Sequence, residues 1–193
     1  CSEICNEFHH GSLMDFDTVY NFGKQVDVLT IEIEHVNIEA LKKLEEEGLK
    51  IFPQPKVLEI IKHKGRQKDF FYVNGIPTAP YKRFDGTAEL KNMMQFPFVW
   101  KSAQFGYDGT GVKVIRSVND LEGLPDVDCI TEALIPFKNE LAVIVSRNEK
   151  GDIKTYPVVE MEFHPTANQV EYVLCPARIS NKVAKEARDI ALH

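Results

Sequence analysis

A strand, a helix and a second strand near the start of the chain constrain its fold more than any other feature. The first stretch, VDVLTIEI from Val26 to Ile33, is rich in β-branched residues and apolar until its two glutamates, as in a buried parallel strand. A helix with Asn37 as N-cap and Gly48 at its end is predicted for NIEALKKLEEEG, and a short second strand for LKIFP. Because parallel strands need such a crossover, the residues up to Pro53 are typical of an open, doubly wound sheet.

The rest of the chain first becomes helical and then consists mainly of strands. Two helices with a break at Gly65 are predicted for VLEIIKHKGRQKDFFYVNG, and an extended segment for GIPTAPYKRF. A short helix is predicted for GTAELKNMM, and a hairpin around a glycine-rich turn for FPFVWKS and VKVI. Further strands are predicted for DCITEALI, NELAVIVSRNEKGDIKTYPVVEMEF and QVEYVLCPARI, with a closing helix. We therefore expect an α/β part followed by an α+β part.

The charge of the chain excludes two classes of partner. Its formal net charge is -6, with a pI of about 5.6, so we expect no broad basic face for nucleic acid or for an anionic membrane. No apolar run approaches the roughly 20 residues that span a bilayer, and the N-terminus lacks the basic-then-apolar pattern of a signal peptide. We expect a cytoplasmic protein.

The two ends and the cysteines of the chain carry further expectations. The chain opens with CSEICNEFHHG, without methionine, and ends inside the helical pattern KVAKEARDIALH, which suggests a fragment of a longer protein. Cys1 and Cys5 are close in sequence, but no second pair matches them, so we expect reduced, mostly buried thiols and no metal site in this chain.

The glycine-rich stretch VWKSAQFGYDGTGVKVI is the strongest candidate for a binding loop. Glycines at 106, 109 and 111 allow positive φ and bring backbone N–H groups close to phosphate oxygens. Lys101 precedes them at the end of a strand, where its ammonium can reach a phosphate as a point charge. The stretch matches neither the Walker pattern nor the dinucleotide fingerprint, because a strand follows it. A tight hairpin turn would explain the same glycines without any ligand.

Two acidic residues follow the hairpin. Glu132 lies in TEALI, a strand edge that can offer backbone hydrogen bonds to a purine, and Glu140 comes eight residues later, where a carboxylate can accept bonds from ribose hydroxyls. The alternative for Glu140 is a solvated acid beside a strand.

This order of elements resembles the ATP-grasp superfamily. The similarity narrows to the 5-(carboxyamino)imidazole ribonucleotide synthetase family of purine biosynthesis, over about Val26 to Pro176, on TIEIEHV, FPQPKVLEIIKHKGRQKDFF, GIPTAPY, FGYDGTG, ELAVIVSRN and YPVVE. The resemblance implies an ATP-grasp fold fragment preceded by the end of a Rossmann-like (pre-ATP-grasp) open sheet. Residues 1–54 would end the Rossmann-like domain, 55–135 would form linker helices and the small lid domain, and 136–193 would begin an incomplete C-terminal domain.

The resemblance also implies a reaction. The family joins bicarbonate to the amine of 5-aminoimidazole ribonucleotide while ATP becomes ADP and phosphate, by way of carboxyphosphate. Expected partners are thus ATP, bicarbonate and the ribonucleotide, and the resemblance implies a homodimer. The Mg²⁺ that accompanies ATP would be held by acidic residues outside this chain, so we expect the chain alone to be inactive.

The family's nucleotide contacts map onto several positions of this sequence. Lys101 and Lys64 resemble lysines or arginines that contact ATP phosphates. The expected flap over the phosphates comprises Gly106, Tyr107, Asp108, Gly109, Thr110 and Gly111. The expected adenine hinge comprises Glu132, Ala133, Leu134 and Ile135, with Glu140 on the ribose. His164 resembles a nucleotide-contacting histidine, with Phe163 as the competing alignment. Many family members carry arginine or lysine at Thr110, so one cationic contact from the flap would be missing or supplied by another residue.

Three residues resemble family positions that act on the second substrate. Glu32 would orient the amine and accept a proton, with Glu34 as the alternate residue, because we expect one of the pair to face the other way. Tyr107 and Asp108 would lie nearest the imidazole and bicarbonate.

Two other functions remain open. The chain could belong to another ATP-grasp ligase or formate-dependent transferase of purine synthesis, or it could be a non-catalytic nucleotide-binding module.

Overall fold

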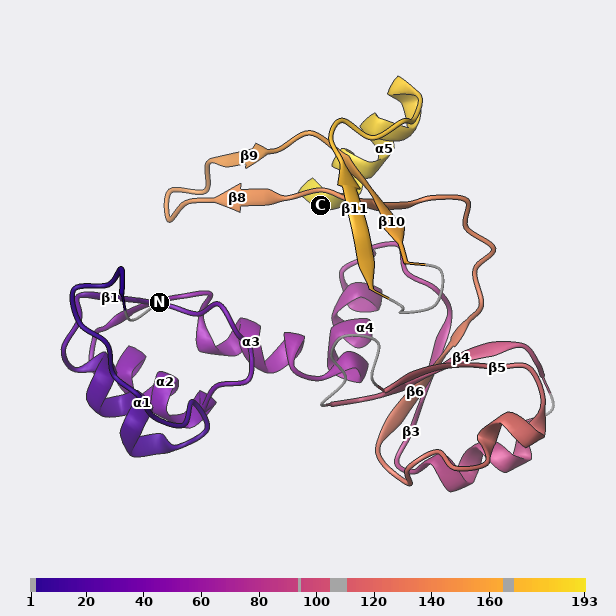
Figure 1. Ribbon diagram of the computed structural model, residues 1–193, viewed down its shortest axis with the longest axis horizontal. Coiled ribbons are helices and arrows are strands. Elements are labelled where there is room, and N and C mark those ends of the chain that lie inside the picture. Colours follow the sequence, from indigo (N-terminus) through magenta and orange to yellow (C-terminus); the bar gives the residue numbers. More distant parts are fainter. Residues whose placement is uncertain (1–2, 94, 105–110, 165–168) are drawn as a thin grey trace. The chain divides into compact units, whose positions relative to one another are not determined.

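The computed structural model describes residues 3–93, 95–104, 111–164 and 169–193. It divides into two compact units, residues 1–67 and 68–193, and each is described by itself (Figure 1). Within the described ranges, no helix combines the length and apolar character needed to cross a membrane.

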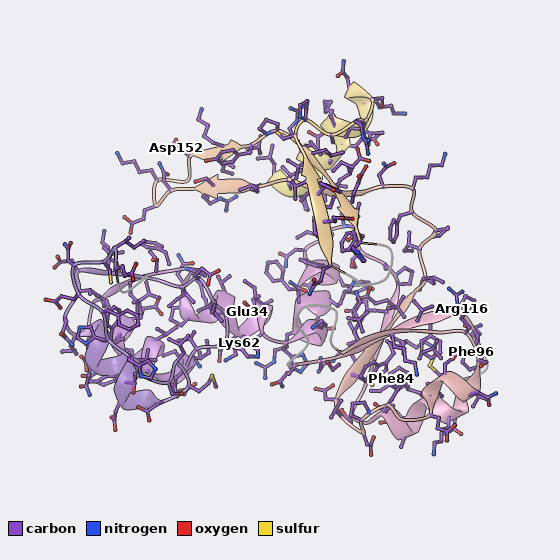
Figure 2. The ribbon with its side chains drawn as sticks, viewed as in Figure 1. Glu34, Lys62, Phe84, Phe96, Arg116 and Asp152 are labelled. Carbon is purple, nitrogen blue, oxygen red and sulfur yellow. The ribbon has the colours of Figure 1, made fainter. Side chains whose placement is uncertain are left out.

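Unit 1 contains the predicted strand–helix–strand unit. Its elements are α1 (Phe16–Gly23), β1 (Val28–Thr30), α2 (Ile38–Glu46), β2 (Lys50–Phe52) and α3 (Pro55–Ile61). β1 and β2 pair in parallel, with Val28 opposite Lys50, which confirms the prediction. β1 is shorter than predicted, however: it ends at Thr30, so Glu32 and Glu34 lie in the loop beyond it (Figure 2 labels Glu34). α1 was not predicted, although Asp15 caps it by accepting a bond from the Thr18 N–H at 2.8 Å.

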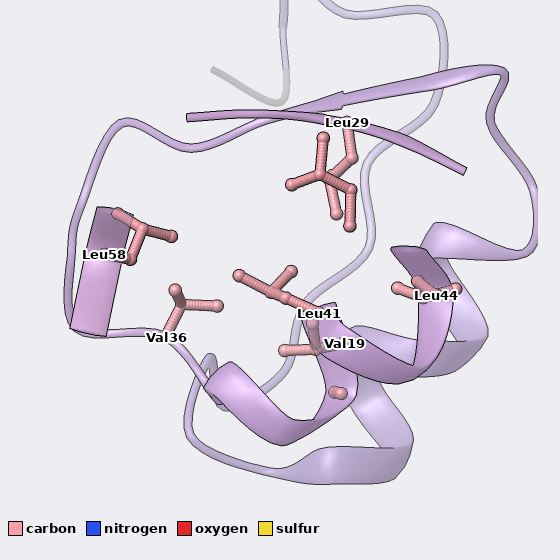
Figure 3. Close-up of a cluster of buried hydrophobic side chains, with 8 residues drawn as sticks. Val19, Leu29, Val36, Leu41, Leu44 and Leu58 are labelled. Carbon is pink, nitrogen blue, oxygen red and sulfur yellow. The ribbon is translucent and has the colours of Figure 1, made fainter. Parts of the chain in front are cut away.

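The ends of α2 follow the sequence prediction. The Asn37 side chain accepts a hydrogen bond from the Ala40 N–H at 2.9 Å, as an N-cap does. Gly48 has φ +96° and follows the helix, so the chain turns there at little steric cost. The apolar face of α2 packs into a core that Figure 3 shows, made of Val19, Leu29, Val36, Ala40, Leu41, Leu44, Ile51 and Leu58.

The helix break after α3 falls two to three residues before the predicted one. α3 ends at Ile61, and α4 (Lys64–Val73) begins with Gly65 already inside it. His63 lies at the break, and its Nδ1 accepts hydrogen bonds from the N–H groups of Gly65 at 3.1 Å and Arg66 at 3.3 Å. The prediction was wrong because this imidazole satisfies N–H groups of the first turn, so the glycine is not needed to end a helix.

Unit 2 begins with a four-stranded antiparallel sheet in the order β3–β6–β4–β5. The strands are β3 (Tyr81–Phe84), β4 (Phe98–Ser102), β5 (Val112–Ile115) and β6 (Cys129–Ala133). β4 and β5 form the predicted hairpin, with Lys101 opposite Val112. Two short 3₁₀ helices, η1 (Thr87–Asn92) and η2 (Val118–Leu121), contribute to its core together with the strands. That core comprises Leu90, Phe98, Trp100, Ile115, Leu121 and Cys129.

The register of this sheet assigns its side chains to two faces. Trp100 pairs with Thr131 and belongs to the core face. Val99 pairs with Glu132, Lys101 pairs with Ile130, and Tyr81 also pairs with Glu132. Because directly opposed residues share a face and neighbours alternate, Lys101, Glu132 and Tyr81 lie together on the face opposite the core.

The last part of unit 2 is also largely β. β7 (Glu140–Ala142), β10 (Val159–Phe163) and β11 (Val170–Leu174) form a three-stranded sheet in the order β11–β10–β7. β8 (Val145–Arg147) and β9 (Ile153–Thr155) form a hairpin, and α5 (Asn181–Leu192) closes the chain. Cys5, Cys129 and Cys175 are free thiols, as expected. The expectation of mostly buried thiols is wrong, because Cys5 and Cys175 are exposed and only Cys129 of these three is buried.

Candidate functional site

Lys101 and Glu132 form an ion pair on the face of the four-stranded sheet opposite its core. The Lys101 Nζ lies 3.0 Å from the Glu132 Oε2. The carboxylate side chain is 9% exposed and the lysine side chain 27%. The structure therefore brings together two residues that the sequence predicted separately, and leaves the ammonium partly open to solvent.

A second lysine, absent from the sequence-based site, completes this group. Lys68, on α4, places its Nζ 3.3 Å from the other carboxylate oxygen, Glu132 Oε1, and donates to the Thr78 Oγ1 at 2.5 Å. Its side chain is 12% exposed. The carboxylate thus lies between two ammonium groups, and the three side chains carry a formal charge of about +1 at neutral pH. Lys68 and Thr78 lie in the stretches KGRQKDFF and GIPTAPY, where only Lys64 was predicted to belong to the site.

Hydrogen bonds hold α4 against the same face. The Tyr81 hydroxyl donates to Asp69 Oδ1 at 2.7 Å, and Arg83 Nη1 lies 2.6 Å from Asp69 Oδ2. The bond to the Asp69 carboxylate raises the pKa of Tyr81 to about 12. α4 is thereby tied to β3 one residue away from Lys68, which fixes the backbone that carries this lysine.

The predicted hinge leaves the sheet beside the ion pair. The Ala133 N–H donates to the Pro80 carbonyl at 2.9 Å and is therefore already used. Leu134 is half-buried and Ile135 is 47% exposed, just beyond the end of β6. A base bound here would have to take a backbone N–H bond from Leu134 or Ile135 instead of from Ala133.

Most of the predicted flap cannot be placed. Gly106, Tyr107, Asp108, Gly109 and Thr110 lie outside the described residues. Gly111 is described, with φ +75°, and its carbonyl accepts a bond from the Ser102 N–H at 2.9 Å. A residue with a side chain is strained at such a φ, so the hairpin requires glycine at this position for geometric reasons.

The structure describes both residues of the two alignments of the predicted histidine. Glu140 on β7 pairs with Met161 on β10. Phe163 is the last residue of β10, and the pairing of β10 with β11 changes register between Glu162 and Phe163. His164 follows the end of β10, is exposed, and donates its N–H to the Gln169 carbonyl at 2.8 Å. Phe163 and His164 therefore both lie at an irregular strand end.

A separate group of charged side chains surrounds Glu160 on β10, and it was not predicted. Glu160 is 3% exposed and accepts bonds from Arg178 Nη2 at 3.0 Å, Arg178 Nε at 3.1 Å and Asn139 Nδ2 at 2.6 Å. Arg178 also pairs with Glu162. Hydrogen bonding to Arg178 lowers the pKa of Glu160 to about 2, and the two carboxylates raise the pKa of Arg178. These contacts fix the segment before α5 against β10.

The remaining candidates, Glu32 and Lys64, belong to unit 1. Glu32 is exposed and lines a cavity of about 480 Å³ together with His9, His10 and Thr30, whereas Glu34 is not among its lining residues. Lys64 is the first residue of α4.

The chemistry of the described side chains suits a phosphate better than a metal. Lys101 presents a partly exposed ammonium, which is a point charge suited to phosphate oxygens. Among the residues with described positions, no group of three or more histidine, cysteine, aspartate or glutamate residues could hold a metal ion.

Comparison with known families gives two matches that together cover most of the chain. The ATP-grasp domain matches residues 69–193, and the ribonucleotide synthetase preATP-grasp domain matches residues 1–62. These matches confirm the fold class and the resemblance expected from the sequence.

Individual proteins extend the similarity. The phosphoribosylaminoimidazole carboxylase of Ogataea methanolica is 35% identical over 190 residues, which cover 94% of this chain and 35% of the relative. The solved N5-carboxyaminoimidazole ribonucleotide synthetase of Thermotoga maritima is 37% identical with a TM-score of 0.85, over 99% of this chain and 49% of that one. The Aspergillus clavatus N5-carboxyaminoimidazole synthase, solved with ADP and 5-aminoimidazole ribonucleotide, is 30% identical with a TM-score of 0.86, over 99% and 52%. The chain thus spans between 35% and 52% of the length of these proteins.

Proposed function

Because the chain belongs to the ATP-grasp family, we propose that it is part of an ATP-dependent carbon–nitrogen ligase that carboxylates 5-aminoimidazole ribonucleotide with bicarbonate. The products are 5-(carboxyamino)imidazole ribonucleotide, ADP and phosphate, within purine biosynthesis. The names of the similar proteins support this substrate, as does the ADP and 5-aminoimidazole ribonucleotide bound to the Aspergillus clavatus synthase.

The observation that carries the proposal is the position of Lys101. Its side chain is partly exposed, at the strand end that leads into the glycine-rich turn. There it can bind phosphate oxygens and stabilise the negative charge that develops when the γ-phosphoryl group is transferred to bicarbonate. Lys64 adds a second positive charge to the phosphates in this proposal.

The segment after Glu132 and the glycine-rich turn have separate roles. Leu134 and Ile135 bind the adenine through backbone groups, and Glu140 accepts bonds from the ribose hydroxyls. The flap, residues 106–111, closes over the phosphates and excludes water, which protects the carboxyphosphate from hydrolysis. His164 is the candidate for a nucleotide contact, with Phe163 as the alternative position.

The second substrate binds through Glu32, Tyr107 and Asp108. Glu32 orients the amine of the ribonucleotide and accepts its proton as the carbon–nitrogen bond forms. Its place in the lining of a cavity supports it over Glu34. Acidic residues outside this chain would hold the Mg²⁺ that accompanies ATP, and the ion would neutralise phosphate charge, so we expect no turnover by this chain alone. We propose a cytoplasmic homodimer for the intact enzyme.

Phosphate release from ATP tests the proposal directly. The full-length protein is assayed with bicarbonate, with and without 5-aminoimidazole ribonucleotide, and with glycinamide ribonucleotide as the matched control. We expect phosphate release to require bicarbonate and to be stimulated by 5-aminoimidazole ribonucleotide but not by glycinamide ribonucleotide. Stimulation by glycinamide ribonucleotide would instead identify a related purine ligase, and ATP binding without any turnover would identify a nucleotide-binding module.

The pair Glu32→Gln and Glu34→Gln sharpens the same assay. Both changes remove one negative charge from the same loop, so general electrostatics affects them alike. We expect Glu32→Gln to lower ribonucleotide-stimulated release by about 100-fold, as for loss of a general base, and Glu34→Gln to stay within about threefold of the parent. Equal effects would contradict the assignment of Glu32.

A further inference from the structure

The carboxylate of Glu132 has more cationic partners than an ion pair requires. Each of its two oxygens faces a different ammonium group, Lys68 on Oε1 and Lys101 on Oε2. Glu132 and Lys68 are nearly buried, whereas Lys101 is the most exposed of the three. The group therefore has an inner, fixed side and an outer side that is open to a ligand.

The charge of the group depends on Lys68. A carboxylate paired with Lys101 alone would neutralise it and compete with any phosphate for the same ammonium. With Lys68 on the other oxygen, the three groups keep a formal charge of about +1, which attracts an anion. Lys68 therefore increases the net positive charge that a ligand meets at Lys101.

Lys68 is itself held in place by the segment TAPY. The Thr78 hydroxyl oxygen accepts a bond from its Nζ, and the Pro80 carbonyl accepts the N–H of Ala133, the residue after Glu132. Two residues of one short segment therefore fix the lysine and the strand end that carries the carboxylate.

We propose that Lys68 is a positioning residue for nucleotide binding: through Glu132 it fixes Lys101 and keeps the charge of Lys101 available to the ATP phosphates. The proposal rests on the phosphate-binding role of Lys101 proposed above. It assigns a task to the GIPTAPY motif, which holds Lys68 through Thr78. Lys68 acts through Glu132 and does not itself contact the nucleotide.

The first test compares Lys68→Met with Lys82→Met in the full-length protein. Lys82 lies on β3 of the same sheet, but it is exposed and pairs across the sheet with Thr131 on the core face, so it controls for loss of one positive charge. We expect Lys68→Met to raise the Kd for ATP about 10-fold, and to change the Kd for adenosine, which lacks phosphates, by less than about twofold. Lys82→Met should leave both unchanged. Equal weakening of ATP and adenosine binding would overturn the proposal, because it would indicate a general structural defect.

A double-mutant cycle separates an indirect role from direct contact. If Lys68 acts only through Lys101, Lys68→Met should have almost no further effect on ATP binding in a Lys101→Met background. Additive effects would overturn the proposal, because they would mean that Lys68 binds ATP by itself. Lys68→Arg keeps a positive charge beside the Glu132 carboxylate, so its ATP affinity should lie within about threefold of the parent.

The two proposals fail in different ways. Phosphate release that does not depend on 5-aminoimidazole ribonucleotide would contradict the carboxylation reaction. The double-mutant cycle is measured as ATP binding, so it would still test the role of Lys68. An additive cycle would contradict the positioning role of Lys68 and leave the carboxylation reaction standing.

Discussion

Two buried glutamates in unit 2 have opposite surroundings. Glu132 on β6 lies between two lysines, so one acid has two cations, whereas Arg178 lies between Glu160 and Glu162, so one cation has two acids. The first group keeps a formal charge of about +1 and the second about -1 at neutral pH. The surplus charge differs in sign, although each group contains a nearly buried glutamate on a strand.

The geometry of the cations also differs. Arg178 donates to Glu160 through two side-chain nitrogens and its backbone N–H, and Asn139 donates as well, so the carboxylate is saturated with donors. A planar guanidinium holds a carboxylate rigidly in this way, whereas a lysine ammonium is a mobile point charge. From this comparison we expect the Glu160 group (Glu160, Glu162 and Arg178) to serve stability, and the Glu132 group (Lys68, Lys101 and Glu132) to serve binding as proposed above.

The largest expected effect concerns Lys101. Lys101→Met should lower phosphate release by the full-length protein at least about 100-fold, because charge stabilisation on the transferred phosphoryl group is lost. The melting temperature should change by less than about 2 °C, because Lys68 still pairs with the Glu132 carboxylate. A large fall in melting temperature with retained activity would place this lysine in the same class as Arg178.

Arg178→Met should have the reverse profile. It leaves the nearly buried Glu160 carboxylate without its main partner, so we expect the melting temperature to fall by about 5 °C. ATP affinity at a temperature where the variant is folded should stay within about threefold. A loss of ATP affinity above tenfold without a change in melting temperature would contradict the assigned structural role.

Lowering the pH should reduce the difference in melting temperature between the parent protein and Arg178→Met. The folded-state pKa of Glu160 is lowered from 4.5 to about 2. Its ionised form therefore stabilises the fold fully at pH values above the unfolded-state pKa, and this contribution is lost as the pH falls toward 2. The difference in melting temperature should therefore be full above about pH 5 and clearly smaller at pH 3. A difference that is constant between pH 3 and pH 7 would mean that packing of the arginine stem, and not the ion pair, stabilises this region.

The smallest effect is expected for Tyr81, whose hydroxyl helps to hold α4 against the sheet face that carries Glu132. Tyr81→Phe removes the hydroxyl that donates to Asp69 while the Arg83 contact remains. We expect the melting temperature to fall by about 2 °C and ATP affinity to change by less than about twofold. A larger loss of affinity would mean that the position of α4, and not only the charge of Lys68, controls Lys101.

Local patterns in the sequence predicted the parts of the fold that depend on local chemistry. The parallel strand pair, the Asn37 cap and the hairpin of Lys101 were predicted because each depends on periodicity, capping or turn residues that lie close in sequence. The break at Gly65 was wrong because a side chain, His63, satisfies the N–H groups that a glycine would otherwise mark. The helix α1 was missed, although Asp15 offers a cap.

The Glu132 group was only half predicted for a different reason. Lys101 and Glu132 could be selected by the resemblance and by their places on strands. Lys68 could not, because its role depends on α4 lying against β6, a contact between segments about 60 residues apart that has no signature in local periodicity. The same holds for Glu160 and Arg178, which meet only because β10 and the segment before α5 are adjacent.

The contact between α1 and α2 limits how the first unit can vary. Gly23, the last residue of α1, is so close to α2 that a Cβ added there would lie 2.3 Å from a methyl carbon of Leu44. Alanine normally favours a helix over glycine by about 1 kcal/mol. At this position that preference is reversed, so among homologous or engineered chains a more helix-prone residue at 23 would have to be accompanied by a smaller one at 44.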